Sequence, residues 1–256
     1  MTEMVVLHEL VFDENNEAKV GDLIASGNLN LIIKKPEITA KQIAIQAIAA
    51  NSGFELSHSN FNKKKIEELN KSIAQNSFKA ITSIVVVKDG KLLLEEYFNN
   101  TDRNTLHDTR SVGKSFTSAL MGIAINDGYI KNENQTLNSY YDLTKFSNYS
   151  AKKDSVKLRD LLTMSSAFNG SDKNSESPGN EENMYPTDDW VKFALDLPMD
   201  SLKTNGKQWD YFTAGVIILG DILNKSVPEG LEKYADKKLF KPLNIDKYQW
   251  QYTPQK

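Results

Sequence analysis

The 256-residue sequence contains no cysteine and only three histidines. Without cysteine the chain has no disulfide, no thiol nucleophile and no thiolate ligand for a metal, and the redox compartment stays undetermined. The histidines, at positions 8, 58 and 107, are far apart in the sequence and show no ligand spacing such as His-x-x-x-His. We therefore expect neither a metal nor another cofactor.

The chain also lacks long apolar runs and an excess of basic residues. No segment approaches the length of a membrane span, and residues 1–21 lack the basic start and apolar core of a signal peptide. The net charge is −3 and the lysines are scattered among Asp and Glu, which disfavours nucleic-acid binding. With 39% hydrophobic residues, the chain can bury a core as one large domain or as a domain plus an extension. We expect a cytoplasmic protein with neither a nucleic-acid nor a membrane partner.

The most informative stretch runs from Thr109 to Gly128. Its apolar residues recur at three- and four-residue steps, which predicts an amphipathic helix that ends near Gly128. The residues of this stripe are Val112, Phe116, Ala119, Leu120, Ile123 and Ala124. In the first turn, Ser111 and Lys114 are three residues apart, so their side chains share one helix face. A serine hydroxyl needs such a neighbouring base to become a nucleophile, and a helix N-terminus favours the negative charge that develops on it.

The pattern Ser-x-x-Lys is weak evidence by itself. With 21 serines and 28 lysines in the chain, chance gives about two matches. The second match, Ser150 and Lys153, lies in a polar run without apolar periodicity. We expect it to be a solvated loop, with Ser150 exposed and Lys153 not buried against it. Ser111, in contrast, follows a predicted strand hairpin and begins an apolar helix, which is the context that supports a catalytic motif.

The strongest local prediction is a β-hairpin at residues 81–98, where two β-rich runs flank Asp89-Gly90. Its expected core residues are Ile84, Val86, Leu92 and Leu94. The other predicted elements are strands at residues 4–12 and 28–35 and helices at residues 39–51, 62–77, 156–164 and 188–199. Residues 137–155 predict a loop-rich surface, and the polar residues 169–183 predict a mobile loop.

Several segments together resemble one known family. SVGKSFTSALMGIAINDGYI closely resembles the active-site helix of the serine β-lactamase and penicillin-binding-protein superfamily, in its class C-like branch of esterases and 6-aminohexanoate-dimer hydrolase-like proteins. VVVKDGKLLLEEYF, LRDLLTMSSAF, WDYFTAGVIILGDIL and KKLFKPLNI are similar to further segments of that family, in the same order. An ordered series is more specific than any single motif.

The resemblance, which covers roughly residue 54 to the end, implies the fold and the domains. The expected fold is α/β (α+β) and β-lactamase/transpeptidase-like, with an antiparallel sheet covered by helices and a mainly helical region. Residues 53–256 would form this serine hydrolase domain, and residues 1–52 an extension that packs on it.

The resemblance also implies the site. Ser111 would form an acyl-enzyme with a small ester or amide, Lys114 would be its base, and Tyr211 would relay a proton, because Tyr211 falls where the family carries the tyrosine of its Tyr-x-Asn motif. Thr213 replaces the asparagine of that motif. It keeps a hydroxyl with which to contact a substrate but loses the amide. Ala167 stands where the family commonly has glycine.

The family's third motif, Lys-Thr-Gly or a His-containing variant, lies on a strand beyond the point where this sequence ends. We therefore expect a C-terminally truncated member with an incomplete sheet, and an open edge or oligomer contact beside the Ser111 helix. A further C-terminal segment or a second copy would complete it, and hydrolysis by the chain alone would be weak. The alternative function is a catalytically weak or inactive binding or structural protein.

Overall fold

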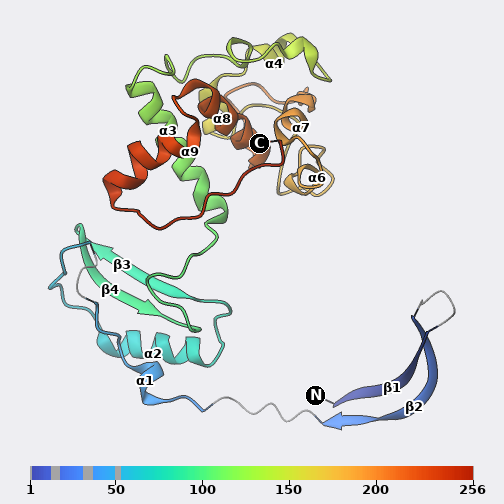
Figure 1. Cartoon of the computed structure of the whole chain (residues 1–256), viewed down its shortest axis with the longest axis vertical. Helices are drawn as coiled ribbons and strands as arrows, with labels where there is room; N and C mark the ends of the chain where they lie inside the picture. Colours follow the sequence, from blue (N-terminus) through green and yellow to red (C-terminus); the bar gives the residue numbers. More distant parts are fainter. Residues whose placement is uncertain (1, 13–17, 31–36, 50–52, 256) are drawn as a thin grey trace. The chain divides into compact units, whose positions relative to one another are not determined.

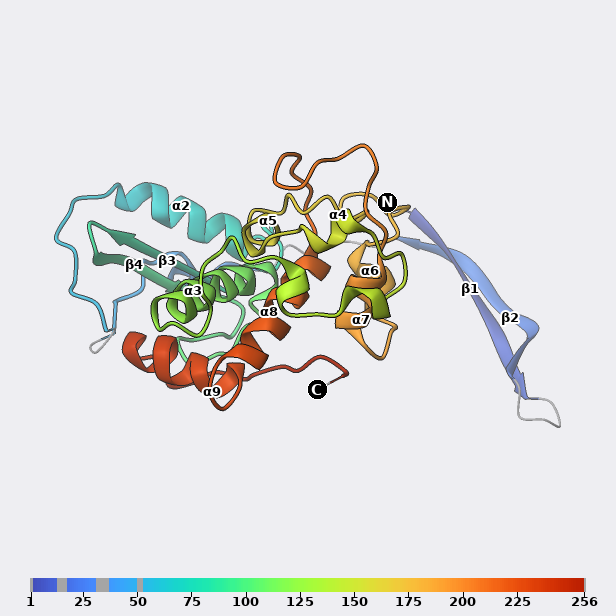
Figure 2. The ribbon, with the colours of Figure 1, turned by 90° about the horizontal axis from the view of Figure 1, so that it is seen from above.

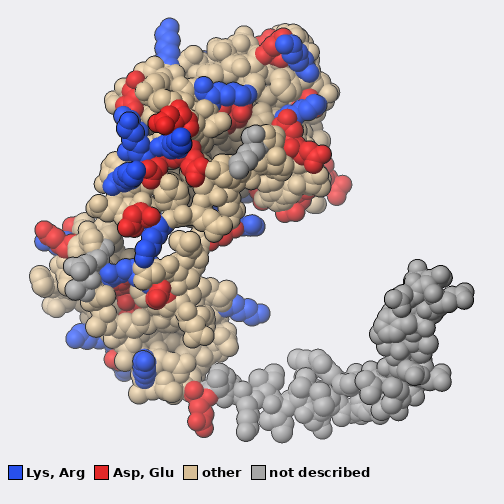
Figure 3. Space-filling view, in the orientation of Figure 1, with Lys and Arg blue, Asp and Glu red and all other residues tan. Residues whose placement is uncertain are grey.

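The computed structural model describes residues 2–12, 18–30, 37–49 and 53–255. The chain divides into two compact units, Met1–Arg103 and Asn104–Lys256, and each is described by itself (Figure 1). Among the described residues, no helix has the length and apolar character needed to cross a membrane. Basic and acidic side chains are interspersed over the face seen in Figure 3, so that face carries no continuous basic patch.

The first unit begins with an antiparallel hairpin of β1 (Thr2–Phe12) and β2 (Ala18–Asn30), with a register shift around His8. The predicted first strand is confirmed. The predicted strand at residues 28–35 coincides with β2 only up to Asn30, and its remainder lies outside the described residues.

A second hairpin, of β3 (Ser83–Lys88) and β4 (Lys91–Tyr97), confirms the prediction made from Asp89-Gly90. Asp89 and Gly90 have φ angles of 52° and 74°, and two positive φ angles give the tight turn whose twist matches that of the strands. Helix α2 (Lys63–Ala74) also forms as predicted and lies along the hairpin (Figure 1).

The hairpin core is asymmetric. Leu92 and Leu94 of β4 are buried as expected, but Val86, which lies opposite Leu94, is 38% exposed. The prediction for Val86 was therefore wrong. The contact that α2 makes through Asn70, which donates to Glu96 at 3.2 Å, is with β4 rather than with β3. No strand among the described residues pairs with the outer edge of β3.

The helix predicted at residues 39–51 is wrong for residues 44–49, and its last two residues lie outside the described part of the chain. Helix α1 covers only Ala40–Ile43, because the chain turns to an extended conformation at Ala44. The side chain of Gln46 then pairs with the backbone of Tyr97, accepting from its N–H at 3.0 Å and donating to its carbonyl at 2.7 Å. This pairing with β4 replaces the helical bonds of the segment.

The second unit is mainly helical. Its helices are α3 (Gly113–Asn126), α4 (Ala151–Asp154), α5 (Leu158–Leu162), α6 (Glu181–Met184), α7 (Trp190–Asp196), α8 (Thr213–Ser226) and α9 (Leu231–Ala235). Helix α8 is central, because it packs against α3, α5, α7 and α9 (Figure 2). Its buried apolar residues include Ile218, Leu219 and Ile222.

Residues 137–155 form the predicted loop-rich surface, with short helical turns and many exposed residues, but Lys153 is not solvated there. Lys153 is 0% exposed, and its Nζ donates to the carbonyls of Ser147 at 3.0 Å and Leu195 at 2.8 Å. Ser150 is half-buried and caps α4 by accepting the backbone N–H of Lys153 at 3.3 Å. The expectations that Ser150 is exposed and that Lys153 is solvated were therefore wrong. The burial of Lys153 still does not make Ser150 a candidate nucleophile, because the Lys153 amine is bound to backbone carbonyls.

The polar run at residues 169–183, for which the sequence predicts a mobile loop, contains hydrogen bonds between its own residues. Asn180 caps α6 and donates to the carbonyl of Asn174 at 3.1 Å, and the Ser171 N–H donates to Ser177 Oγ at 2.9 Å. Ser177 and Asn180 are both buried. The segment is a hydrogen-bonded loop held by its own side chains.

Candidate active site

Ser111 lies in a 3₁₀ turn, Arg110–Val112, that leads into α3. Asp108 shapes this turn by accepting the Arg110 N–H at 2.9 Å. Arg110 has a φ of 45°, in the left-handed region that is unfavourable for a residue with a side chain. Such strain persists where the surrounding structure imposes it, and it concentrates at functional sites. No sequence pattern predicted this conformation of Arg110.

Lys114 lies one helical turn after Ser111. Its Nζ donates to Ser111 Oγ at 3.2 Å, so the expected pairing of amine and hydroxyl is present. Ser111 is exposed and Lys114 is half-buried. The hydroxyl is therefore accessible to a substrate while it contacts its candidate base.

Tyr211 approaches the same amine from the segment that precedes α8. Lys114 Nζ lies 5.2 Å from the centre of the Tyr211 ring, within the range of a cation–π contact. The half-buried Tyr211 also contacts the ring of Trp209, at 6.3 Å between centroids. The structure thus brings Ser111, Lys114 and Tyr211 together, and their catalytic roles stay predictions.

Thr213 occupies the first position of α8 and is half-buried. Its backbone N–H donates to Asp172 Oδ2 at 2.7 Å. Its Oγ1 is buried and has no hydrogen-bond partner among the described residues. The predicted contact between this hydroxyl and a substrate thus has no support in the geometry and remains a prediction.

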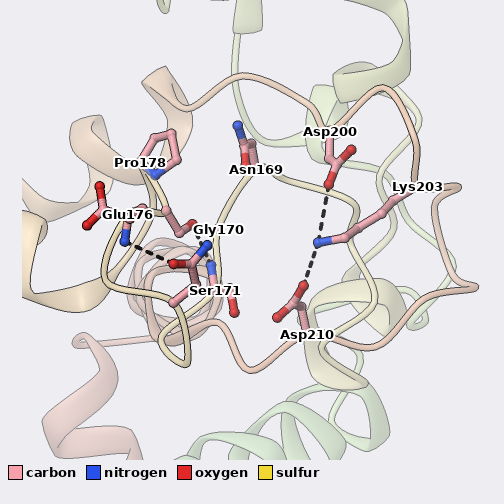
Figure 4. A pocket seen from close by; sticks show the side chains of 10 residues that line it. Asn169, Gly170, Ser171, Glu176, Pro178, Asp200, Lys203 and Asp210 are labelled. Carbon is pink, nitrogen blue, oxygen red and sulfur yellow. Dashed lines mark hydrogen bonds and ion pairs between the residues drawn. The ribbon is translucent and has the colours of Figure 1, made fainter.

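A polar pocket of about 470 Å³ lies beside the Tyr211 segment and is lined by loop residues 169–171, 174 and 176–178 together with Asp200, Lys203 and Asp210 (Figure 4). Lys203 bridges the two carboxylates, at 3.3 Å from Asp200 and 2.5 Å from Asp210. Burial alone would lower the pKa of Lys203, but its hydrogen bonds to Asp210 and Asp200 raise it above the usual value. The bridge fixes the residue immediately before Tyr211.

A second cavity, of about 530 Å³, lies against Phe116 and Leu120 of α3 and is bounded by aromatic residues that include Tyr248 and Trp250. Neither Ser111 nor Lys114 lines it. Among the described residues, no group of three or more His, Asp or Glu side chains is arranged to hold a metal.

The class of this protein follows from its match to a family model. The model of the Beta-lactamase family matches residues 75–255. This chain belongs to that family. The match includes the β3–β4 hairpin, Ser111, Lys114 and Tyr211, and it confirms the resemblance inferred from the sequence.

Solved structures agree on the β-lactamase-like fold. The "Putative 6-aminohexanoate-dimer hydrolase" from Bacillus anthracis is 18% identical with a TM-score of 0.50, over 62% of this chain and 43% of that protein. The "putative beta-lactamase" from Bacteroides dorei DSM 17855 is 16% identical with a TM-score of 0.57, over 73% of this chain and 53% of that protein. The present chain spans about half the length of these structures. No curated protein matches the sequence.

Proposed function

We propose that this β-lactamase-family chain is a serine hydrolase that cleaves small esters or amides through an acyl-enzyme on Ser111. The observation that supports this most directly is the 3.2 Å contact between Lys114 Nζ and Ser111 Oγ, beside the Tyr211 ring. A nucleophile with a base in hydrogen-bond range, and a third group next to the base, is the arrangement that covalent catalysis requires.

In this mechanism Ser111 Oγ attacks the substrate carbonyl carbon while the free amine of Lys114 accepts its proton. The carbonyl electron pair moves to oxygen and forms a tetrahedral intermediate. Because the first N–H groups of a helix have no intrahelical acceptor, the backbone N–H of Ser111 is placed to donate to that oxyanion.

The intermediate collapses with loss of the alcohol or amine. Tyr211 donates its hydroxyl proton to this leaving group and regains a proton from the Lys114 ammonium. Water then attacks the carbonyl carbon of the acyl-enzyme and gives a proton to the same pair. The bond from the acyl carbon to Ser111 Oγ breaks, the pair returns that proton to Oγ, and the acid is released. Protons and electrons balance over the cycle, which consumes one water.

A catalytically weak or inactive binding protein is the second candidate. The buried hydroxyl of Thr213 favours it, because that position then offers no side-chain group to orient a substrate. The two candidates differ in a single measurable property, the reactivity of Ser111.

The experiment is covalent labelling of the folded chain with a fluorophosphonate, followed by peptide mass spectrometry, beside an assay with a p-nitrophenyl ester. The proposal expects label on Ser111 and ester turnover, both abolished by Ser111→Ala. Ser150→Ala is the matched control, because Ser150 belongs to the other Ser-x-x-Lys match, and it should leave both signals unchanged. A folded wild-type chain that takes up no label would contradict the hydrolase and support the binding protein.

A further inference from the structure

One residue, Asp172, connects its loop to the segment around Tyr211 and to the start of α6. The backbone N–H of Asp172 donates to the Tyr211 carbonyl at 2.8 Å. Its Oδ2 accepts the Thr213 N–H at 2.7 Å, and its Oδ1 accepts the Glu181 N–H at 2.9 Å. Asp172 therefore holds the chain on both sides of Phe212, and it anchors the start of α6 with the same carboxylate.

The sequence around α8 explains why this outside carboxylate is needed. The N-terminal capping position of α8 is Phe212, whose side chain makes no capping hydrogen bond. A helix start leaves unpaired N–H groups that Ser, Thr, Asp or Asn usually satisfy locally. Here Asp172, from a distant loop, supplies the missing acceptor at Thr213. Its negative charge is also favourable at the positive end of the helix dipole.

Phe212 completes the restraint. It is 3% exposed, and its ring stacks on Phe168 with centroids 5.8 Å apart. The residue after Tyr211 is thus fixed by packing, while Asp172 binds the carbonyl of Tyr211 and the amide of Thr213. Next to Asp172, Lys173 Nζ lies 4.5 Å from the centre of the Trp209 ring. The loop therefore contacts residues on both sides of Tyr211 in the sequence.

We propose that Asp172 is a positioning residue that holds the Tyr211 phenol beside Lys114. This inference rests on the proposed function. Asp172 acts through the backbone of residues 211–213 and takes no part in bond making or breaking. Proton transfer requires hydrogen-bond distances, and a displacement of about 1 Å can cost on the order of 100-fold in rate.

The test is a double-mutant cycle between Asp172→Ala and Tyr211→Phe, assayed by turnover of the p-nitrophenyl ester. We expect Asp172→Ala to lower kcat about 10- to 100-fold with little change in KM, and to have almost no further effect in the Tyr211→Phe background. Asp172→Asn keeps one acceptor oxygen and should fall between Ala and the wild type. An equal loss in both backgrounds would mean that Asp172 supports the fold alone, and it would overturn the inference.

The matched control is Asp189→Ala. Asp189 caps α7, where its Oδ1 accepts the Lys192 N–H at 2.8 Å, and it lies outside the Tyr211 contacts described above. The Asp189→Ala variant loses a comparable capping hydrogen bond, and we expect its kcat to equal that of the wild type. A fall in kcat equal to that of Asp172→Ala would show that helix capping in general, rather than the position of Tyr211, controls the rate.

Amide hydrogen exchange separates this inference from the proposed function. In Asp172→Ala the Thr213 amide should exchange at least about tenfold faster, since its acceptor is removed, while Asp189→Ala should leave it unchanged. If wild-type Ser111 takes up no fluorophosphonate, the hydrolase fails, but the exchange result still shows whether Asp172 orders residues 211–213. Unchanged exchange at Thr213 would overturn the positioning role even in an active enzyme.

Discussion

Lys114 Nζ, from the first turn of α3, lies 5.2 Å from the centre of the ring of Tyr211, which precedes α8 by two residues. The same chemical pair occurs near the other end of α8, where Lys225 lies 4.9 Å from the ring of Tyr141. There the lysine also binds Asp221. A Lys–Tyr contact alone is therefore not diagnostic, and what distinguishes Lys114 is the serine hydroxyl at 3.2 Å.

The first prediction uses this pair of lysines. Lys114→Ala should lower ester turnover and fluorophosphonate labelling on the order of 100- to 10,000-fold, because the base that accepts the Ser111 proton is removed. Lys225→Ala removes the same kind of contact with a tyrosine ring and should leave both rates within about twofold of wild type, since surface ion pairs contribute little. Equal losses in the two variants would refute the assignment of Lys114 as base.

The second prediction concerns two adjacent lysines that both donate to two backbone carbonyls. Lys153 is fully buried, whereas Lys152, which binds the carbonyls of Asp200 and Lys203, is half-buried. Lys153→Met should lower the free energy of unfolding by about 1–3 kcal/mol, because it leaves buried carbonyls without donors. Lys152→Met should cost less, since water can reach its carbonyls.

All three tryptophans, at positions 190, 209 and 250, belong to the second unit, so their fluorescence reports the unfolding of that unit. Urea titrations of the two lysine variants followed by this signal give the comparison directly. A smaller loss for Lys153→Met than for Lys152→Met would contradict the structural account of the buried amine.

The third prediction addresses Ala167, where the family commonly has glycine. The turn forms, but Ala167 takes a φ of 59° and is 4% exposed. Ala167→Gly should raise the free energy of unfolding by about 0.5–1 kcal/mol, because relief of the left-handed strain exceeds the lost methyl burial and added chain entropy. The same substitution at Ala194, buried within α7, should instead cost about 1 kcal/mol or more. Tryptophan fluorescence in urea would reveal whether the signs differ.

The fourth prediction is a pH dependence in the first unit. A hydrogen bond from Arg103, whose Nε lies 2.7 Å from Oε1, holds the pKa of Glu95 below its usual 4.5. The unfolded chain then binds more protons, so this stabilisation is full above about pH 4.5 and is lost as pH falls through the folded pKa. Glu95→Gln should weaken the acid sensitivity of the unit.

Glu96, the next residue, provides an internal control of opposite sign. Burial raises the pKa of Glu96, so its contribution is present at low pH and is lost as pH rises through the raised value. Glu96→Gln should therefore make the unit less sensitive to the rise in pH. Because no tryptophan lies in this unit, the readout is hydrogen exchange of the β4 amides between about pH 3 and 7. A Glu95→Gln variant with unchanged acid sensitivity would contradict the Arg103 assignment.

The parts of the molecule that the sequence predicted are those governed by local pattern. The apolar period of α3 and the turn at Asp89-Gly90 specify their elements without distant partners, and the ordered motifs placed Ser111, Lys114 and Tyr211 in one family site. Three features depend instead on hydrogen-bond partners that are distant in the sequence. Gln46 leaves its helix to pair with Tyr97, Lys153 binds the carbonyl of Leu195, and Asp172 binds residues 181, 211 and 213. No spacing in the sequence encodes such partners.

The outer edge of β3 has a practical consequence. Val85, Val86 and Val87 are 54%, 38% and 45% exposed, and among the described residues no strand covers their side of the sheet. An uncovered, valine-rich strand offers its backbone N–H and C=O groups to any extended segment that it meets. Because association through this strand increases with protein concentration, the concentration of the protein must be controlled in every assay. Rates measured on this chain should be extrapolated from a dilution series, or association will be mistaken for a property of the active site.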